Sequence, residues 1–214
     1  MSEKRDGNAK KKLLIAFAIV LAVLVILICS SAIIDAIEKK RAGDVEIDFD
    51  FYPADFEADI FKNQEYLELM NAEFLNFKDS GVTLGIDREQ AAQYGDDVEF
   101  IVEMIYDIIY ADVEGYNARF SDKYYEKHAP KEAFTMQMVY DIHIERLSTE
   151  KNSEGNEGDN YTKSIFSVEY KIYQNNGTFR RDIGDGSKIQ YITITDKSGE
   201  WSIDLVSTLN QNIR

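Results

Sequence analysis

The chain has 214 residues and a formal net charge of −15 at pH 7, and 44% of its residues are hydrophobic. The first 43 residues hold eight Lys/Arg and four Asp/Glu, so the remainder carries a net charge of −19. A domain this acidic is repelled by phosphate backbones and by anionic lipid headgroups, which argues against a nucleic-acid partner. The only cysteine, Cys29, excludes an intramolecular disulfide and a cysteine-based zinc site.

A run without charged side chains occupies residues 13–34. As a helix rising about 1.5 Å per residue, it would be roughly 33 Å long, enough to cross a hydrocarbon core of about 30 Å. Five Lys/Arg precede the run and three follow it closely, which places residues 1–12 in the cytoplasm as a short tip. We therefore predict a single-pass protein of the cell membrane with its large domain outside.

Two alternatives to a permanent anchor stay open. In the first alternative, the chain is a bacterial lipoprotein and Cys29 is its acylated cysteine, although Ile28 occupies the position where such signals carry a small residue. In the other, Ser30-Ser31-Ala32 is a signal-peptidase site, and cleavage there releases the domain. The length of the apolar run favours the membrane-spanning helix over a cleaved signal, and Ile28 argues against the lipoprotein.

Residues 35–95 are predicted to form a stalk, a short strand or extended arm at 45–51, and amphipathic helices. A helix over about residues 54–78 is indicated because Pro53 suits a first helical position and apolar residues then recur at three- and four-residue steps. These residues are Phe56, Ile60, Leu67, Met70, Phe74 and Phe77. Asp87 and Gln90 have the spacing of a capping box, with Gly95 ending the short helix that follows.

The strongest helical stripe beyond the span predicts a helix over about residues 97–111, with shorter helical pieces following to about residue 128. Its apolar members are Phe100, Ile101, Met104, Ile105, Ile108 and Ile109. The period then changes to two, which predicts strands at 138–146, 162–174, 189–195 and 201–206. Asn176-Gly177 carries the signal of a tight hairpin turn, with a return strand beginning at Phe179. The fold class is therefore α+β, with helices covering one face of a curved antiparallel sheet.

The run from Ile101 to Tyr125 resembles the opening of the cone-shaped α+β domains shared by nuclear transport factor two, SnoaL-like cyclases and ketosteroid isomerases. The similarity lies in a long helix followed by Ala111-Asp112, a short helix ending near Phe120-Ser121, and a strand meander from 138 to 209. It implies a cone-shaped domain over residues 96–214. Membrane-anchored versions of this fold are found among assembly factors of bacterial conjugation and type IV secretion, and among Gram-positive envelope proteins.

The resemblance implies that ligand contacts, if there are any, lie inside the cone, where tyrosines donate hydrogen bonds in isomerases of this fold. Alternation places Tyr140 and Tyr170 on the inward faces of their strands, and His128 lies near the mouth. Each also has a structural interpretation, because tyrosine rings pack with locally satisfied hydroxyls and a histidine suits the end of a helix. His143 is expected to point outward, where it cannot act as a base in the cone.

Arg180, Arg181 and Asp182 precede a glycine-rich loop, and they form either a binding edge or a cross-strand ion pair. We predict no cofactor, because the chain lacks a phosphate loop, a dinucleotide fingerprint, HExxH and Gly-x-Ser-x-Gly. We also predict no metal site, since alternation splits the acidic residues of 44–59 and no EF-hand spacing occurs.

Two functions follow as hypotheses. The first is an anchored, non-enzymatic module whose apolar cone is filled and whose outer surface binds a protein of the envelope or of a secretion assembly. The second is a small-ligand binder or an isomerase- or cyclase-like enzyme, which requires an open pocket with titratable groups. The volume and lining of the cone separate the two.

Overall fold

The computed structural model describes residues 49–71, 75–152, 161–197 and 199–209, and residues 49–214 form one compact unit. The predicted cytoplasmic tip, the membrane span at 13–34 and most of the stalk lie outside the described residues. Among the residues that are described, no helix is long and apolar enough to cross a membrane. The boundary predicted between residues 95 and 96 falls inside the compact unit, because strands on both sides of it share one sheet.

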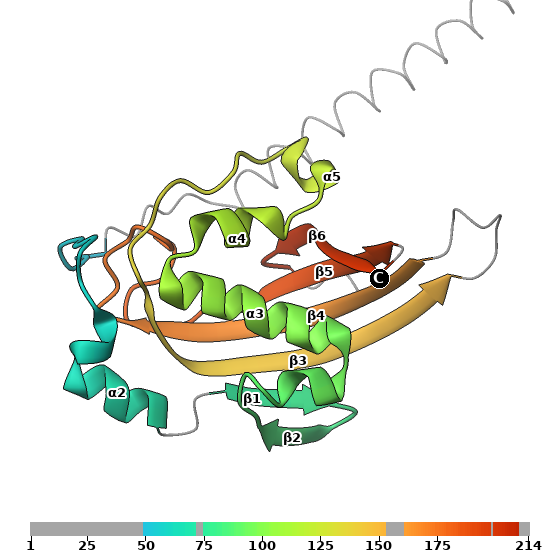
Figure 1. Cartoon of the computed structure of the whole chain (residues 1–214), viewed down its shortest axis with the longest axis horizontal. Helices are drawn as coiled ribbons and strands as arrows, with labels where there is room; N and C mark the ends of the chain where they lie inside the picture. Colours follow the sequence, from blue (N-terminus) through green and yellow to red (C-terminus); the bar gives the residue numbers. More distant parts are fainter. Residues whose placement is uncertain (1–48, 72–74, 153–160, 198, 210–214) are drawn as a thin grey trace, which may run out of the picture. The chain divides into compact units, whose positions relative to one another are not determined.

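Within these described residues, six strands form a single sheet in the order β2-β1-β3-β4-β5-β6 (Figure 1). Neighbours are antiparallel except for β1 and β3, which are parallel. The α+β class is confirmed, whereas the expectation of a wholly antiparallel sheet is wrong at β1. The bounds are β1 Leu75–Asp79, β2 Val82–Gly85, β3 Met138–Asn152, β4 Tyr161–Tyr173, β5 Gln190–Lys197 and β6 Glu200–Ser207.

The long helix predicted over residues 54–78 is wrong. The structure has a short 3-10 helix, η1 (Ile60–Lys62), then helix α2 (Gln64–Asn71), and then strand β1. Asn63 separates the two helices, because its side chain accepts a hydrogen bond from the Tyr66 N–H at 3.1 Å and starts α2 afresh. In β1, buried Leu75 and Phe77 alternate with half-buried neighbours. This period of two was not recognised because Phe77 also fits the helical spacing of the residues before it.

The hairpin between β1 and β2 turns at Ser80 and Gly81, whose φ angles are 50° and 83°. Two successive residues with positive φ match the twist of a two-residue hairpin. The capping box predicted at Asp87 and Gln90 is confirmed by reciprocal hydrogen bonds from backbone N–H to side chain, at 3.1 and 2.8 Å. It opens the turn before the 3-10 helix η2 (Ala91–Tyr94), and Gly95 ends that helix.

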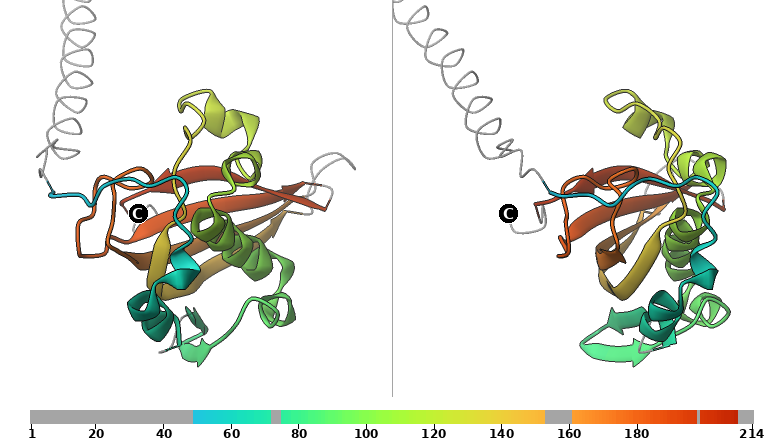
Figure 2. Two further views of the ribbon diagram at one scale, coloured as in Figure 1. Left: turned by 60° about the vertical axis from the view of Figure 1, so that its left-hand side comes forward. Right: turned by 90° about the vertical axis from the view of Figure 1, so that its left-hand side faces the viewer.

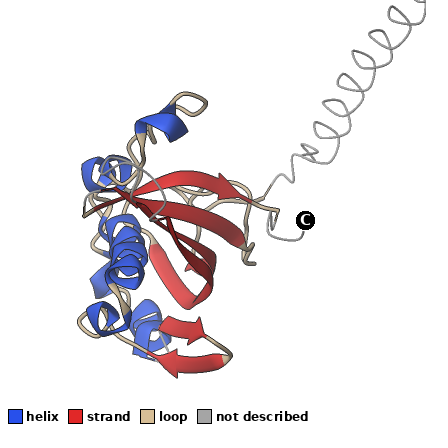
Figure 3. Ribbon diagram, turned by 90° about the vertical axis from the view of Figure 1, so that its right-hand side faces the viewer, coloured by secondary structure: helices blue, strands red, loops and turns tan. Residues whose placement is uncertain are grey.

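Helix α3 (Asp96–Tyr110) confirms the predicted helix to within one residue, and it lies over β3 and β4 (Figure 1). Its fully buried residues recur at three- and four-residue steps: Val98, Ile101, Val102, Ile105, Ile108 and Ile109. The shorter helices α4 (Val113–Ala118) and α5 (Asp122–Tyr125) follow, capped by the side chains of Asp112 and Ser121. The helices gather on one side of the sheet (Figure 3), so the core lies between α3 and the inner face of the strands.

A bulge in β3 changes which residues face this core. Tyr140 pairs with Lys171, but the next regular pair is His143 with Glu169, and Asp141 between them has a φ of 51°. Val139 and Ile142 are therefore both fully buried, while Tyr140 shares the outer face with Lys171. The expectation that Tyr140 faces inward is wrong. His143 points outward as expected, with half of its side chain exposed and a hydrogen bond to Asp141.

Candidate functional site

The segment between β4 and β5, residues 174–189, forms an irregular loop rather than the predicted hairpin with a return strand at Phe179. The buried side chain of Asn175 holds this loop in shape. Its amide donates hydrogen bonds to the carbonyls of Arg180 and Ile183 at 3.1 and 2.6 Å, and its oxygen accepts one from the Gly177 N–H at 2.9 Å. These bonds satisfy three backbone groups of the loop in place of strand pairing.

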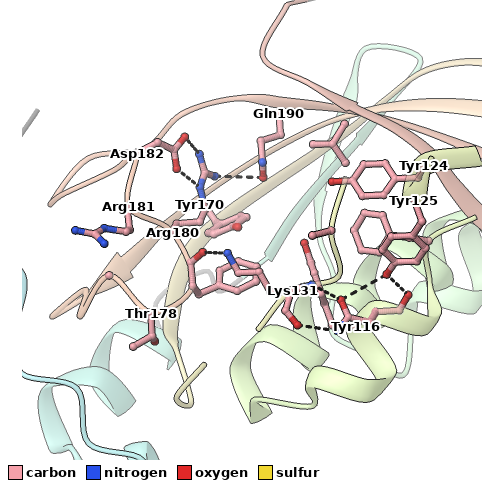
Figure 4. Close-up of a pocket in the computed structure, with 16 residues that line it drawn as sticks. Tyr116, Tyr124, Tyr125, Lys131, Tyr170, Thr178, Arg180, Arg181, Asp182 and Gln190 are labelled. Carbon is pink, nitrogen blue, oxygen red and sulfur yellow. Dashed lines mark hydrogen bonds and ion pairs between the residues drawn. The ribbon is translucent and has the colours of Figure 1, made fainter. Parts of the chain in front are cut away.

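A half-open hollow of about 490 Å³ lies between this loop, helices α4 and α5, and the adjoining ends of β4, β5 and β6. We call it the tyrosine pocket. Figure 4 shows Tyr124 and Tyr125 on one side of it and Arg180 and Asp182 on the other. Its lining comprises Tyr116, Asn117, Phe120, Tyr124, Tyr125, Ala129, Lys131, Tyr170, Gly177, Thr178, Phe179, Arg180, Arg181, Asp182, Gln190 and Val206.

Arg180 is the most buried charged residue of this lining, with 5% of its side chain exposed. Its guanidinium donates two hydrogen bonds to Asp182, at 2.8 and 2.7 Å, and one to Gln190 at 3.2 Å. It also lies over the ring of Tyr170, 5.4 Å from the centroid. Burial alone would raise the pKa of Asp182, but the hydrogen bonds and charge of Arg180 outweigh it and lower that pKa. Asp182 is therefore an ionised partner of Arg180 at neutral pH.

Four tyrosines and two phenylalanines supply the aromatic part of the lining, and burial affects three of the tyrosines most. Tyr170 is 1% exposed on the inner face of β4, while Tyr116 and Tyr124 are half-buried on α4 and α5. Burial raises the pKa of all three hydroxyls, so they stay protonated at neutral pH and can donate hydrogen bonds. Within the part of the chain that the structure describes, no hydrogen bond is formed by the hydroxyls of Tyr116 and Tyr124.

Lys131 enters the pocket from the segment that follows α5. Its ammonium group donates a hydrogen bond to the carbonyl of Phe179 and lies 5.0 Å from the centre of the Phe179 ring. No carboxylate among the described residues lies within ion-pairing distance of it. Burial lowers the pKa of this ammonium. Asn117 fixes the Lys131 backbone from α4, accepting from its N–H at 2.8 Å and donating to its carbonyl at 2.9 Å.

The other side of the loop is covered by the arm, residues 49–59, which runs beside it in both views of Figure 2. The Tyr52 N–H donates to the Asn175 carbonyl at 3.0 Å. The ring of Phe51 lies against Gly177, where a Cβ would come within 2.9 Å of it, and Phe49 lies against Gly184 in the same way. Arg181 bridges the two sides, because it lines the pocket and lies 5.8 Å from the centre of the Phe51 ring.

The three residues singled out from the sequence are not brought together. Tyr170 lines the pocket, and Tyr140 lies on the opposite face of the sheet. His128 is exposed and stacks on Tyr124, with ring centroids 4.3 Å apart. It therefore contacts a lining residue but does not itself line the pocket. Of the two interpretations of Arg180 and Asp182, the structure has an ion pair within one loop at the pocket, not across two strands.

Sequence reasoning missed Lys131, Tyr116 and Tyr124 as pocket residues. The sequence left open whether the cone is open or filled, and at this end of the sheet the structure has a hollow that contains charged side chains. Comparison of the chain with known protein families, curated proteins and solved structures finds no match. The resemblance to nuclear transport factor two therefore stays a prediction.

Proposed function

We propose that residues 49–214 form a small-ligand-binding domain, held outside the cell membrane by residues 13–34. The observation that carries this proposal is the tyrosine pocket, in which aromatic and hydrogen-bonding side chains from α4, α5, the Lys131 segment and the 174–189 loop converge. A hollow of about 490 Å³ lies in the size range of small-molecule sites, which are typically concave, partly apolar and provided with a few fixed polar groups.

The arrangement favours binding over catalysis. The one carboxylate in the lining, Asp182, is held ionised by Arg180 and is not free to act as a general base. The fold we propose is the cone-shaped one, supported by the long helix α3 packed against the antiparallel strands β3 to β6. Tethering would concentrate such a module near ligands and partners at the membrane.

A bulky residue in the pocket should weaken ligand binding. Val206 lines the pocket, so Val206→Phe is expected to weaken binding of small ring compounds to the full chain in detergent micelles by at least fivefold, because the new ring occupies the hollow. Ligand-observed NMR with a set of such compounds measures this. Val82→Phe makes the same change at a residue that is 58% exposed on β2, and it should bind like the wild type. Equal binding by the two variants would contradict the proposal.

The location and the protein partner need separate tests. Protease added to intact cells should digest the domain and spare a tag at the N-terminus; a protected domain would refute the proposed topology. A partner from the envelope or from a secretion assembly stays a prediction, and pull-down with the full chain tests it.

A further inference from the structure

The tyrosine pocket carries an excess of positive charge in a strongly acidic chain. Its lining has three cations, Lys131, Arg180 and Arg181, and one carboxylate, Asp182, whereas the whole chain has a net charge of −15. Since Asp182 is bound by Arg180, Lys131 and Arg181 are the pocket cations without a carboxylate partner among the described residues. The formal charge of the lining therefore differs in sign from that of the chain as a whole, which favours a negatively charged ligand.

Of these two cations, Lys131 indicates more about the ligand because it is partly buried, whereas Arg181 is exposed. An ammonium group that loses water without gaining a counter-ion is destabilised. Among the described residues, the one hydrogen bond of the Lys131 ammonium, to the Phe179 carbonyl, leaves two of its three N–H donors available to a ligand. An acid group on a ligand would supply the missing counter-ion through charge-assisted hydrogen bonds. Arg181, exposed at the rim, adds attraction over a longer range.

The side of the pocket facing the loop is aromatic. Tyr116 contacts the rings of Phe120, Phe134 and Phe179 at centroid distances of 5.1 to 6.0 Å, and Tyr124 lies 4.5 Å from Phe120. Such a wall favours a planar ring, which buries apolar area and packs edge to face or offset. The hydroxyls of Tyr116 and Tyr124 are protonated donors that the described residues leave without acceptors, so they suit acceptor oxygens on the same ligand.

We infer that the ligand of the tyrosine pocket is a small organic anion with a planar ring, its acid group bound by the Lys131 ammonium and its ring held against Tyr116 and Tyr124. This inference rests on the proposed function and narrows it to one chemical class. Arg180 is a positioning residue in this arrangement, since its guanidinium is used by Asp182, Gln190 and the Tyr170 ring.

Three probes of nearly identical shape test the charge: benzoate, benzamide and benzamidine. The full chain in detergent micelles should bind benzoate at least tenfold more tightly than either of the others, as measured by ligand-observed NMR titration. Lys131→Met should bring benzoate to within about twofold of benzamide. Lys163→Met removes the same charge from the outer face of β4 and should keep the preference. Unchanged thermal unfolding of both variants, followed by Trp201 fluorescence, verifies that they are folded.

Each outcome decides a different part. If benzamide or benzamidine binds as tightly as benzoate, the anionic class is refuted while the pocket proposal stands. A preference for benzoate that survives Lys131→Met refutes the role of Lys131. If inorganic phosphate displaces benzoate at equal concentration, the ring of benzoate adds nothing to its affinity, and the proposed contact of the ring with Tyr116 and Tyr124 is refuted. If none of the three probes binds to the wild-type chain, both this inference and the proposed function are contradicted.

Discussion

Arg146→Met is expected to destabilise the domain by about 3–5 kcal/mol, because it removes the cation that is paired with the buried carboxylate of Asp97. Arg146 donates to Asp79 at 2.9 Å, to the Tyr94 carbonyl at 2.7 Å and to Asp97 at 2.7 Å. Asp97 is 7% exposed, so its charge would be left in the interior without a paired cation and with hydrogen bonds from Ser164 and the Val98 N–H as its remaining described contacts. The bonds of this one guanidinium connect β1, β3, η2 and the first turn of α3.

Urea unfolding followed by Trp201 fluorescence measures this effect, since Trp201 packs against the core and lines the same hollow as Arg146. Arg88→Met is the matched control. Arg88 also makes two hydrogen bonds to a carboxylate, that of Glu103, but its side chain is 46% exposed, so its loss should cost less than about 1 kcal/mol. Adding Asp97→Asn to Arg146→Met should restore part of the stability. Equal effects of Arg146→Met and Arg88→Met would refute the account of this network.

Arg180→Met is expected to cost about 2–3 kcal/mol at pH 7, because it breaks charged hydrogen bonds at a side chain that is 5% exposed. The loss should shrink in acid. The pKa of Asp182 is lowered in the folded chain, so its contribution is fully present above the unfolded pKa of about 3.9 and disappears as the pH falls through the folded value. Urea unfolding at pH 7 and at pH 3 measures the difference.

The neighbouring residue provides the control for this prediction. Arg181→Met makes the same change at an exposed side chain whose one described contact is the Phe51 ring, and it should cost less than about 1 kcal/mol at either pH. A loss for Arg180→Met that is the same at pH 7 and pH 3 would show that the ion pair with Asp182 contributes little and that packing on Tyr170 dominates.

Regular hydrophobic periodicity predicted the regular parts of this fold. Helix α3 and strand β4 follow their patterns closely, and β5 and β6 form where predicted although a register shift at Thr193 and Ile194 interrupts their pairing. The prediction of one helix over residues 54–78 is wrong because its apolar spacing also fits two short helices and a strand. The caps at Asp59 and Asn63 determine where the two short helices begin. The predicted inward direction of Tyr140 is wrong because the bulge in β3 cannot be seen in the sequence pattern. It reverses the face of the β3 residues that precede it.

The candidate site was less predictable because irregular backbone builds most of it. Tyr170 lies on a regular strand, and its inward direction followed from alternation. The positions of Lys131 and Arg180 depend instead on side-chain to backbone bonds made by Asn117 and Asn175. Nothing in a single sequence gives the path of such segments, although the Asn-Asn-Gly run at 175–177 marks a turn. The network of Arg146 could not be predicted either, because its partners Asp79, Tyr94 and Asp97 are distant in the sequence.

The most direct test of a ligand site in the tyrosine pocket is NMR of the full chain labelled at the tyrosine rings and titrated with benzoate. The resonances of Tyr116, Tyr124 and Tyr170 are expected to shift together. Those of Tyr140, on the outer face, and Tyr161, at the far end of β4, are expected to stay in place. Shifts at Tyr140 or Tyr161 equal to those at the pocket tyrosines, or no shift at Tyr116, Tyr124 and Tyr170 at saturating benzoate, would contradict a ligand site in this pocket.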